Sequence, residues 1–296
     1  MSQPQNLQDE LKNLKPQKEF FIGIDSDGCV FDTMEIKQKE CFCPNFIKFY
    51  NLQRVSKYAR ETWEFVNLYS KTRGVNRFKA LLEAVSLLGE RSEVKARNAA
   101  LPDMSALAEW VSSETKLGNP ALESYASRVN DPRIDLALKW SKKVNRDIAD
   151  LVFGINPFPL VEESLQKLTR KADAIVVSQT PVEALKREWE ENSIDKYVQL
   201  IAGQEYGTKT EHIALAAKGK YPDEKILMIG DAPGDYKAAS SNGVLFYPVN
   251  PGHEEESWER FYNEALDKFF GGNYRGEYES RLIDEFHSYL PEKPSW

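Results

Sequence analysis

The chain has too few cysteines for a disulfide framework. Its 296 residues include only three, Cys29, Cys41 and Cys43. The last two form a Cys-x-Cys pair, which lacks the Cys-x-x-Cys spacing of common zinc sites, and no second pair completes such a site. Reduced thiols are the simplest interpretation, so we expect a cytoplasmic protein.

Long apolar runs and an excess of basic residues are also absent. The longest apolar runs span about five residues, whereas a membrane-spanning helix needs about 20. Residues 1–17 are polar and contain no signal-peptide core, so we expect no membrane partner. The net charge of -7 argues against general binding of nucleic acid, which needs a basic surface. A small basic pocket for an anionic metabolite remains compatible with that charge.

What the chain does contain is a set of short apolar runs that predict strands. They are rich in β-branched residues and alternate little with polar residues, as is typical of strands buried on both faces of a parallel sheet. The runs cover residues 20–24, 174–177, 226–229 and 244–247, with a weaker fifth run at 198–202.

Helical patterns separate the later runs. Apolar residues recur at helical spacing over 160–168. Another helix is predicted to begin at Thr180, as an N-cap followed by Pro181, and two more begin near Thr208 and Asp235. This alternation predicts an α/β fold with a doubly wound parallel sheet.

The stretch from about residue 33 to residue 156 interrupts this alternation after its first strand. It contains no persuasive strand. Its apolar spacing predicts a helix over 78–88, closed by Gly89, and a long final helix over 134–151. We therefore expect an inserted α-helical block.

These patterns divide the chain into two domains. Residues 1–33 and 155–296 are predicted to form the α/β core, which includes a helical C-terminal tail, and residues 34–154 form the helical insert. Residues 154–159, rich in glycine and proline, look like the hinge that returns the chain to the core. Residues 1–18 predict a short surface helix or a partly disordered lead-in.

Polar side chains follow three of the predicted strands directly. The segments concerned are Asp25-Ser26-Asp27-Gly28, Ser178-Gln179-Thr180 and Gly230-Asp231-Ala232-Pro233-Gly234-Asp235. Because ligands of open parallel sheets bind at the carboxyl ends of strands, we expect these groups to converge. Acids so close together repel one another and need a cation to stay ionised, and ligands that are all oxygen favour Mg²⁺.

These segments resemble the motifs of the haloacid dehalogenase-like superfamily. Asp25-x-Asp27-Gly28 resembles its first motif, and Ser178 its second. Lys209 resembles the third, and Gly230-Asp231-x-x-x-Asp235 the fourth. All four occur in order and together cover about residues 20–33 and 155–250. The resemblance implies a Rossmann-like core, and it makes the helical insert similar to a type I cap.

The resemblance also implies a role for each residue. Asp25 is the expected nucleophile, which becomes an aspartyl-phosphate. Asp27 is the expected general acid and base, Ser178 binds the phosphoryl oxygens, and Lys209 neutralises their charge. The implied Mg²⁺ ligands are Asp25, the main-chain carbonyl of Asp27, and Asp231.

Three further predictions concern the surroundings of the site. Asp235 follows Asp231 by one helical turn and is expected to support the metal ligands from behind. Arg73 and Arg77 flank a loop of the helical insert and are candidates to clamp an anionic substrate, as is Gln179 beside Ser178. His212 and His253 show no partner pattern and are expected to be structural or surface residues.

The acid at Asp27 selects among activities. In the family that the chain resembles, phosphatases and phosphomutases carry an acid two residues after the nucleophile, whereas dehalogenases and phosphonatases generally do not. The resemblance therefore implies a Mg²⁺-dependent phosphatase that acts on a small phosphorylated metabolite. Two alternatives stay open, a phosphomutase similar to β-phosphoglucomutase and a non-catalytic binding module on the same core.

Overall fold

The computed structural model describes residues 7–296, so the start of the helix predicted over 1–18 lies outside the described residues. The chain forms two compact units. The α/β unit comprises Met1–Thr33 and Gly154–Leu290, and the helical unit comprises Met34–Phe153 and Pro291–Trp296. The structure thus groups residues 291–296 with the helical unit, whereas the sequence-based division placed them in the core.

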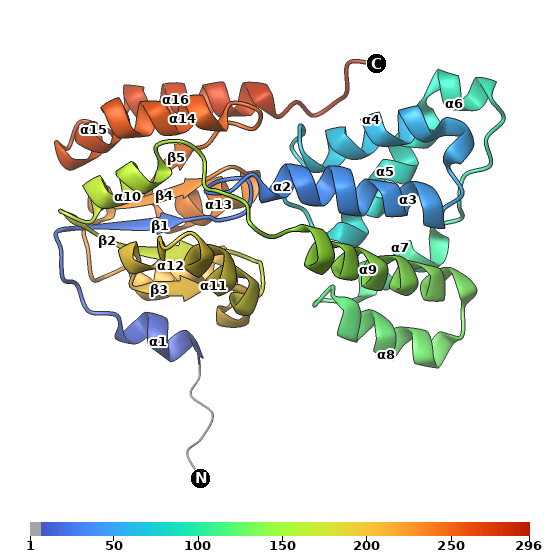
Figure 1. Ribbon diagram of the computed structural model, residues 1–296, viewed down its shortest axis with the longest axis horizontal. Helices are drawn as coiled ribbons and strands as arrows, with labels where there is room; N and C mark the ends of the chain where they lie inside the picture. The colour runs from blue at the N-terminus through green and yellow to red at the C-terminus, as the bar shows by residue number, and fades with distance from the viewer. Residues whose placement is uncertain (1–6) are drawn as a thin grey trace, which may run out of the picture. The chain divides into compact units, whose positions relative to one another are not determined.

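The α/β unit is built on a five-stranded parallel sheet in the order β3-β2-β1-β4-β5, as Figure 1 shows. Every apolar run that predicted a strand forms one. The strands are β1 (Phe20–Ile24), β2 (Ala172–Val177), β3 (Leu200–Ala202), β4 (Ile226–Gly230) and β5 (Leu245–Pro248). The predicted doubly wound α/β class is confirmed, since helices cover both faces of this sheet.

Alternate side chains of each strand enter two separate cores. Ile22 and Ile24 of β1 face one core, and Phe21 faces the other. The first core is closed by α10 (Val161–Leu168), α11 (Val182–Glu191), α14 (Glu254–Arg260), the π-helix η6 (Phe261–Ala265) and α15 (Leu266–Phe270). The second is closed by α1 (Leu7–Asn13), α12 (Lys209–Ala216) and α13 (Pro233–Asn242). Burial on both faces explains why the strands lack polar alternation.

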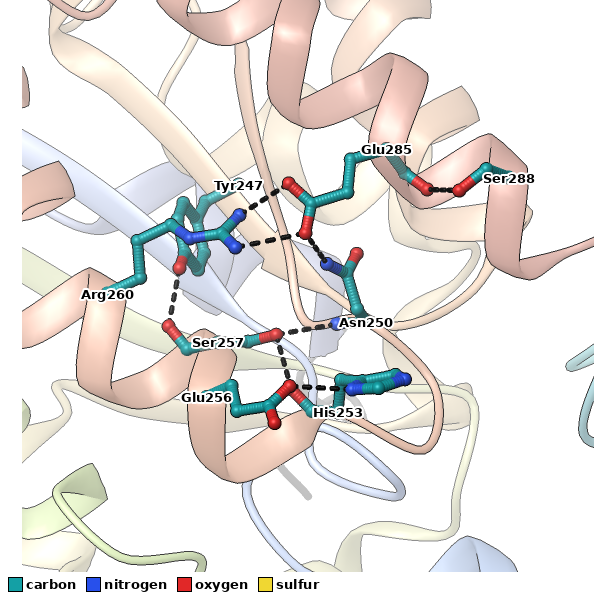
Figure 2. A network of polar contacts seen from close by, with 8 residues as sticks. All are labelled: Tyr247, Asn250, His253, Glu256, Ser257, Arg260, Glu285 and Ser288. Carbon is teal, nitrogen blue, oxygen red and sulfur yellow. Dashed lines mark hydrogen bonds and ion pairs between the residues drawn. The ribbon is translucent and has the colours of Figure 1, made fainter.

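The last helix, α16 (Glu277–Tyr289), covers the β5 edge of the sheet. Its Leu282 enters the first core, and its Phe286 enters the second. Figure 2 shows the polar contacts that hold it there: both oxygens of Glu285 accept from the guanidinium of Arg260, at 2.8 and 2.9 Å. The Glu285 carboxylate also accepts from Nδ2 of Asn250 at 3.1 Å. An edge strand that would otherwise expose unpaired backbone groups is thereby covered.

The helical unit contains no strand among its residues 34–153. Its helices are the α2 stretch (Thr33–Ile36), whose first residue belongs to the α/β unit, the π-helix η1 (Lys37–Phe42), α3 (Cys43–Phe49), α4 (Ser56–Asn67), α5 (Arg77–Glu90), α6 (Ser92–Ala96), α7 (Ser105–Ser113), α8 (Asn119–Val129) and α9 (Pro132–Leu151). The helical unit also contains the short 3₁₀ turn η2 (Gln53–Val55). Three more such turns lie in the α/β unit: η3 (Asp195–Tyr197), η4 (Gln204–Tyr206) and η5 (Asp223–Lys225). Buried Trp63 and Trp140, with ring centroids 6.0 Å apart, lie at the centre of the unit.

One helix end was predicted wrongly. Gly89 was expected to close its helix, but α5 continues through it to Glu90. A Cβ atom at Gly89 would lie 3.1 Å from Cδ1 of Leu101, so the glycine allows close packing instead of a left-handed turn.

The segment Pro291–Trp296 packs on the helical unit. The guanidinium of Arg91 lies over the Trp296 ring, 4.3 Å from its centroid, and over the Tyr58 ring at 4.8 Å. A cation placed over aromatic faces in this way stabilises both partners. Among residues 7–296, no helix combines the length and apolar character needed to cross a bilayer.

Candidate functional site

The register of the sheet aligns the polar residues that follow β1, β2 and β4. Ile24 pairs with Val176 of β2 and with Ile229 of β4. Asp25 is therefore level with the last residue of each neighbouring strand. Ser178 and Asp231 come one residue later, so the expected convergence at this edge of the sheet is present.

Three buried carboxylates form the centre of the site. Asp25, Asp231 and Asp235 each offer an oxygen atom, and these oxygens lie within 4.8 Å of one another. Their side chains are almost fully excluded from solvent. Asp235, which the sequence predicts to support the metal ligands, lies within this cluster, and its role there stays a prediction.

The cluster has the chemistry of a cation site. Burial raises the pKa of Asp25 well above its ordinary value, and repulsion from Asp235 and Asp231 adds to the rise that Lys209 opposes. Burial also raises the pKa of Asp235. Three acids face one lysine, so ionising all of them leaves an excess of negative charge that a bound cation would offset. Carboxylate oxygens suit a hard divalent ion, and these residues fit a metal site of that kind.

Lys209 is fixed at the start of α12 by local sequence. Thr208 is the N-cap: its hydroxyl accepts from the Glu211 amide at 3.2 Å, and the Glu211 carboxylate accepts from the Thr208 amide at 2.7 Å. This reciprocal pair satisfies two helix-end donors. At Gly23 a Cβ atom would lie only 2.6 Å from Cδ1 of Ile213, so the glycine lets α12 approach β1 closely.

The Lys209 ammonium joins two members of the acid cluster. Its Nζ lies 2.9 Å from Oδ2 of Asp25 and 2.6 Å from Oδ1 of Asp235. Burial alone would lower the pKa of Lys209, but the neighbouring carboxylates outweigh burial and raise it. The lysine therefore stays charged at neutral pH.

Asp235 occupies a space that only a glycine leaves open. A Cβ atom at Gly230 would lie 2.3 Å from Cβ of Asp235. The second oxygen of Asp235 accepts from the Ala232 amide at 3.1 Å, at the N-terminus of α13. Asp235 thus links the start of α13 to Lys209.

Asp27 is bound by two threonine hydroxyls. Thr180 Oγ1 donates to Oδ2 of Asp27 at 2.7 Å, and Thr33 Oγ1 donates to Oδ1. The sequence had assigned Thr180 as the N-cap of α11, but that helix begins at Val182, and the Val182 amide donates to Glu205 instead. Sequence reasoning assigned neither threonine a role in the site. The signal for Thr180 was its place in the polar segment after β2, which was expected to converge with Asp27, whereas Thr33 gave none beyond its nearness to Asp27 in the sequence.

Ser178 and Gln179, which follow β2, have different surroundings. Ser178 is buried, and its hydroxyl oxygen accepts from the Thr180 amide at 3.2 Å, which leaves its own proton available to another acceptor. Gln179 is exposed and donates to the carbonyl of Gly207 at 2.9 Å. Contact of Gln179 with a substrate stays a prediction.

The turn after β1 is fixed from behind by two tryptophans. The indole N–H of Trp189 donates to Ser26 Oγ at 3.0 Å, and that of Trp258 donates to the Cys29 carbonyl at 2.7 Å. Gly28 has a φ of 74°, a left-handed conformation that glycine adopts without strain. The backbone around Asp27 is therefore rigidly held.

Arg73 and Arg77 are engaged within the helical unit. Arg73 is buried, and its Nη1 donates to the Leu68 carbonyl at 2.9 Å. Arg77 Nη1 donates to Oδ1 of Asn145 at 2.6 Å and to Oγ of Ser141 at 3.0 Å. Burial lowers the pKa of Arg77 to about 10. The role of these arginines in binding substrate stays a prediction.

Comparison with known proteins gives matches only among solved structures. No protein-family profile matches the chain, and no curated protein matches it. A haloacid dehalogenase-like family hydrolase from Streptococcus pneumoniae is 14% identical with a TM-score of 0.43, covering 83% of this chain and 91% of that chain. A hydrolase of the same superfamily, subfamily IA, from Geobacter sulfurreducens is 14% identical with a TM-score of 0.38, over 79% and 90%.

A third solved structure carries a more specific description. It is a predicted phosphoglycolate phosphatase from Haemophilus somnus, 16% identical with a TM-score of 0.41, over 79% of this chain and 86% of that chain. The chain is similar to haloacid dehalogenase-like hydrolases over most of its length.

Proposed function

We propose that the protein is a Mg²⁺-dependent phosphohydrolase that acts on a small organic phosphate, with Asp25 as the nucleophile. The observation that carries this proposal is the contact of a buried carboxylate with a charged lysine: Asp25 Oδ2 lies 2.9 Å from Lys209 Nζ, within a cluster of two further buried acids. A phosphoryl group carries negative charge into such a site, and its transfer depends mainly on positioning and charge neutralisation.

The first half-reaction transfers the phosphoryl group to the protein. A carboxylate oxygen of Asp25 attacks phosphorus, and the bond from phosphorus to the leaving oxygen breaks. The leaving oxygen keeps the electron pair and takes a proton from the carboxylic acid of Asp27. Lys209 offsets the negative charge on the phosphoryl oxygens. The hydroxyl group of Ser178 donates a hydrogen bond to one of these oxygens.

The second half-reaction returns Asp25 to its starting state. Asp27, now a carboxylate, takes a proton from a water molecule whose oxygen attacks phosphorus. The bond between phosphorus and Asp25 breaks, and its electron pair returns to the carboxylate. The sum is hydrolysis of a phosphate monoester to an alcohol and inorganic phosphate.

The metal would have three ligands from the chain. The carboxylates of Asp25 and Asp231, with the main-chain carbonyl of Asp27, would be its ligands, and Asp235 would support Lys209 beside them. When bound, Mg²⁺ supplies positive charge that keeps the acids ionised and stabilises charge developing on the phosphoryl oxygens.

A screen for released inorganic phosphate tests the proposal. The purified chain is incubated with a panel of small phosphate monoesters, with Mg²⁺ or with a chelator. We expect turnover of at least one monoester with Mg²⁺, and none with Asp25→Asn. Asp223→Asn is the matched control, because Asp223 is a surface acid paired with Lys218.

Three results would contradict the proposal. Absence of turnover across the panel would favour a binding module. Transfer of phosphate between positions of a sugar, without net release, would favour a mutase. Full activity of Asp25→Asn would exclude the assigned nucleophile.

A further inference from the structure

Thr180 connects two groups of the proposed reaction. Its Oγ1 donates to Oδ2 of Asp27 at 2.7 Å, and its amide donates to Oγ of Ser178 at 3.2 Å. Asp27, the expected proton donor, and Ser178, the expected phosphoryl-binding residue, therefore both form a hydrogen bond with Thr180. The sequence places Thr180 two residues after Ser178 but assigns it no role in the reaction.

The backbone of Thr180 is itself held in place. Its carbonyl accepts from the Gln204 amide at 3.2 Å. Behind it, a Cβ atom at Gly203 would lie 2.5 Å from that carbonyl oxygen and 2.8 Å from the Val182 nitrogen. The glycine after β3 thus allows the chain to approach closely, and the rigid end of the sheet fixes where the Thr180 hydroxyl points.

Both carboxylate oxygens of Asp27 accept a hydrogen bond from a hydroxyl group, one from Thr180 and one from Thr33. The two hydroxyls come from separate elements, so together they restrict rotation of the carboxyl group. Proton transfer needs the donor oxygen within about 2.6–3.2 Å of its acceptor. A displacement of about 1 Å can cost about a hundredfold in rate.

We propose that Thr180 is a positioning residue that orients the Asp27 carboxyl group toward the leaving oxygen. This inference rests on the function proposed above. When Asp27 has given up its proton, its carboxylate accepts from the same hydroxyl, so the contact persists through both half-reactions. Thr180 also fixes the position of the Asp27 carboxyl group relative to the Ser178 hydroxyl, because Thr180 forms a hydrogen bond with each of them.

The dependence of rate on the leaving group tests this inference. 4-Nitrophenolate leaves readily without a proton, whereas an alkoxide leaves poorly unless it is protonated. We measure kcat/KM, which reports the half-reaction that releases the leaving group, for 4-nitrophenyl phosphate and for an aliphatic monoester that the wild type hydrolyses. Thr180→Val removes the hydroxyl and keeps the shape of the side chain.

We expect Thr180→Val to lower kcat/KM for the aliphatic ester by about 10- to 100-fold, and for the nitrophenyl ester by less than about threefold. Thr180→Ser, which restores a hydroxyl, is expected to recover most of the loss. In an Asp27→Asn background, Thr180→Val is expected to add little, because both changes remove the same proton transfer. If the valine variant does not fold, Thr180→Ala carries the same test.

Two results would overturn the inference. An equal loss with both esters, or no loss with either, would mean that Thr180 does not orient the proton donor, although the proposed function would stand. A wild type that hydrolyses neither ester nor any other monoester would overturn the proposed function, and this inference with it.

Discussion

Lys209 contacts two buried carboxylates at once, with Nζ 2.9 Å from Oδ2 of Asp25 and 2.6 Å from Oδ1 of Asp235. Asp25 is the expected nucleophile, and Asp235 is held at the start of α13 by its hydrogen bond from the Ala232 amide. We therefore propose that Asp235 positions Lys209.

The pair Lys209 and Asp235 should act as a unit. We expect Lys209→Met to lower kcat by about 100- to 1,000-fold, because a charge that stabilises the transition state is lost. Asp235→Asn should cost less, since asparagine keeps an oxygen that can accept from the Ala232 amide. In a double-mutant cycle measured by kcat/KM, the double variant should be close to Lys209→Met alone. Full additivity would contradict the assigned role of Asp235.

Gly230 should tolerate no side chain. Gly230→Ala places a methyl group 2.3 Å from Cβ of Asp235, in a fully buried site. We expect this overpacking to lower the free energy of unfolding by about 2 kcal/mol and to reduce activity. Gly234→Ala is the control, because a Cβ atom there meets nothing within 4 Å. Denaturant titration of both variants makes the comparison, and similar stabilities for the two would contradict the packing argument.

Mg²⁺ should stabilise the folded chain. A cation that binds only the folded acid cluster adds about 2.7 kcal/mol at a hundredfold excess over its Kd, which corresponds to a rise in Tm of about 5 °C for a chain of this size. Asp231→Asn should shrink this rise, and without metal it should melt above the metal-free wild type, because one repelling charge is gone. Thermal melts with Mg²⁺ and with a chelator measure both effects. Identical wild-type melts would argue against a cation site here.

His212 should make stability depend on pH. Burial, aided by the charge of Lys209, lowers its pKa from 6.5 to about 4. Between pH 6.5 and about pH 4, His212 is protonated in the unfolded chain but neutral in the folded chain. The free energy of unfolding therefore falls as the pH drops through this range. Between about pH 7.5 and about pH 5.5, the wild type should lose about 1 kcal/mol more than His212→Leu. Urea titrations at both pH values check this, and equal losses would contradict it.

The strands and their ends were predictable because burial on both faces leaves a clear mark in sequence. Runs such as residues 226–229 are apolar throughout, and a parallel sheet brings the residues after each run to one edge. Asp25, Ser178 and Asp231 were located in this way.

The contacts that complete the site were not predictable, since they depend on close approaches of the backbone. The pattern of threonine before proline predicts a helix cap at Thr180. Its hydroxyl donates to Asp27, and Gly203 lets the chain pass close behind Thr180. Likewise, Asp235 lies within the acid cluster because Gly230 leaves room for its side chain. Neither approach leaves a periodic pattern in the sequence.

Covalent trapping at Asp25 tests the central claim most directly. The chain is mixed with Mg²⁺ and a monoester that it hydrolyses, quenched rapidly in acid, digested, and measured by mass spectrometry. We predict that the peptide containing Asp25 gains the mass of one phosphoryl group, that the modified residue is Asp25, and that the gain disappears in Asp25→Asn. Turnover with no phosphorylated peptide at any quench time, or phosphate on another residue, would contradict the account.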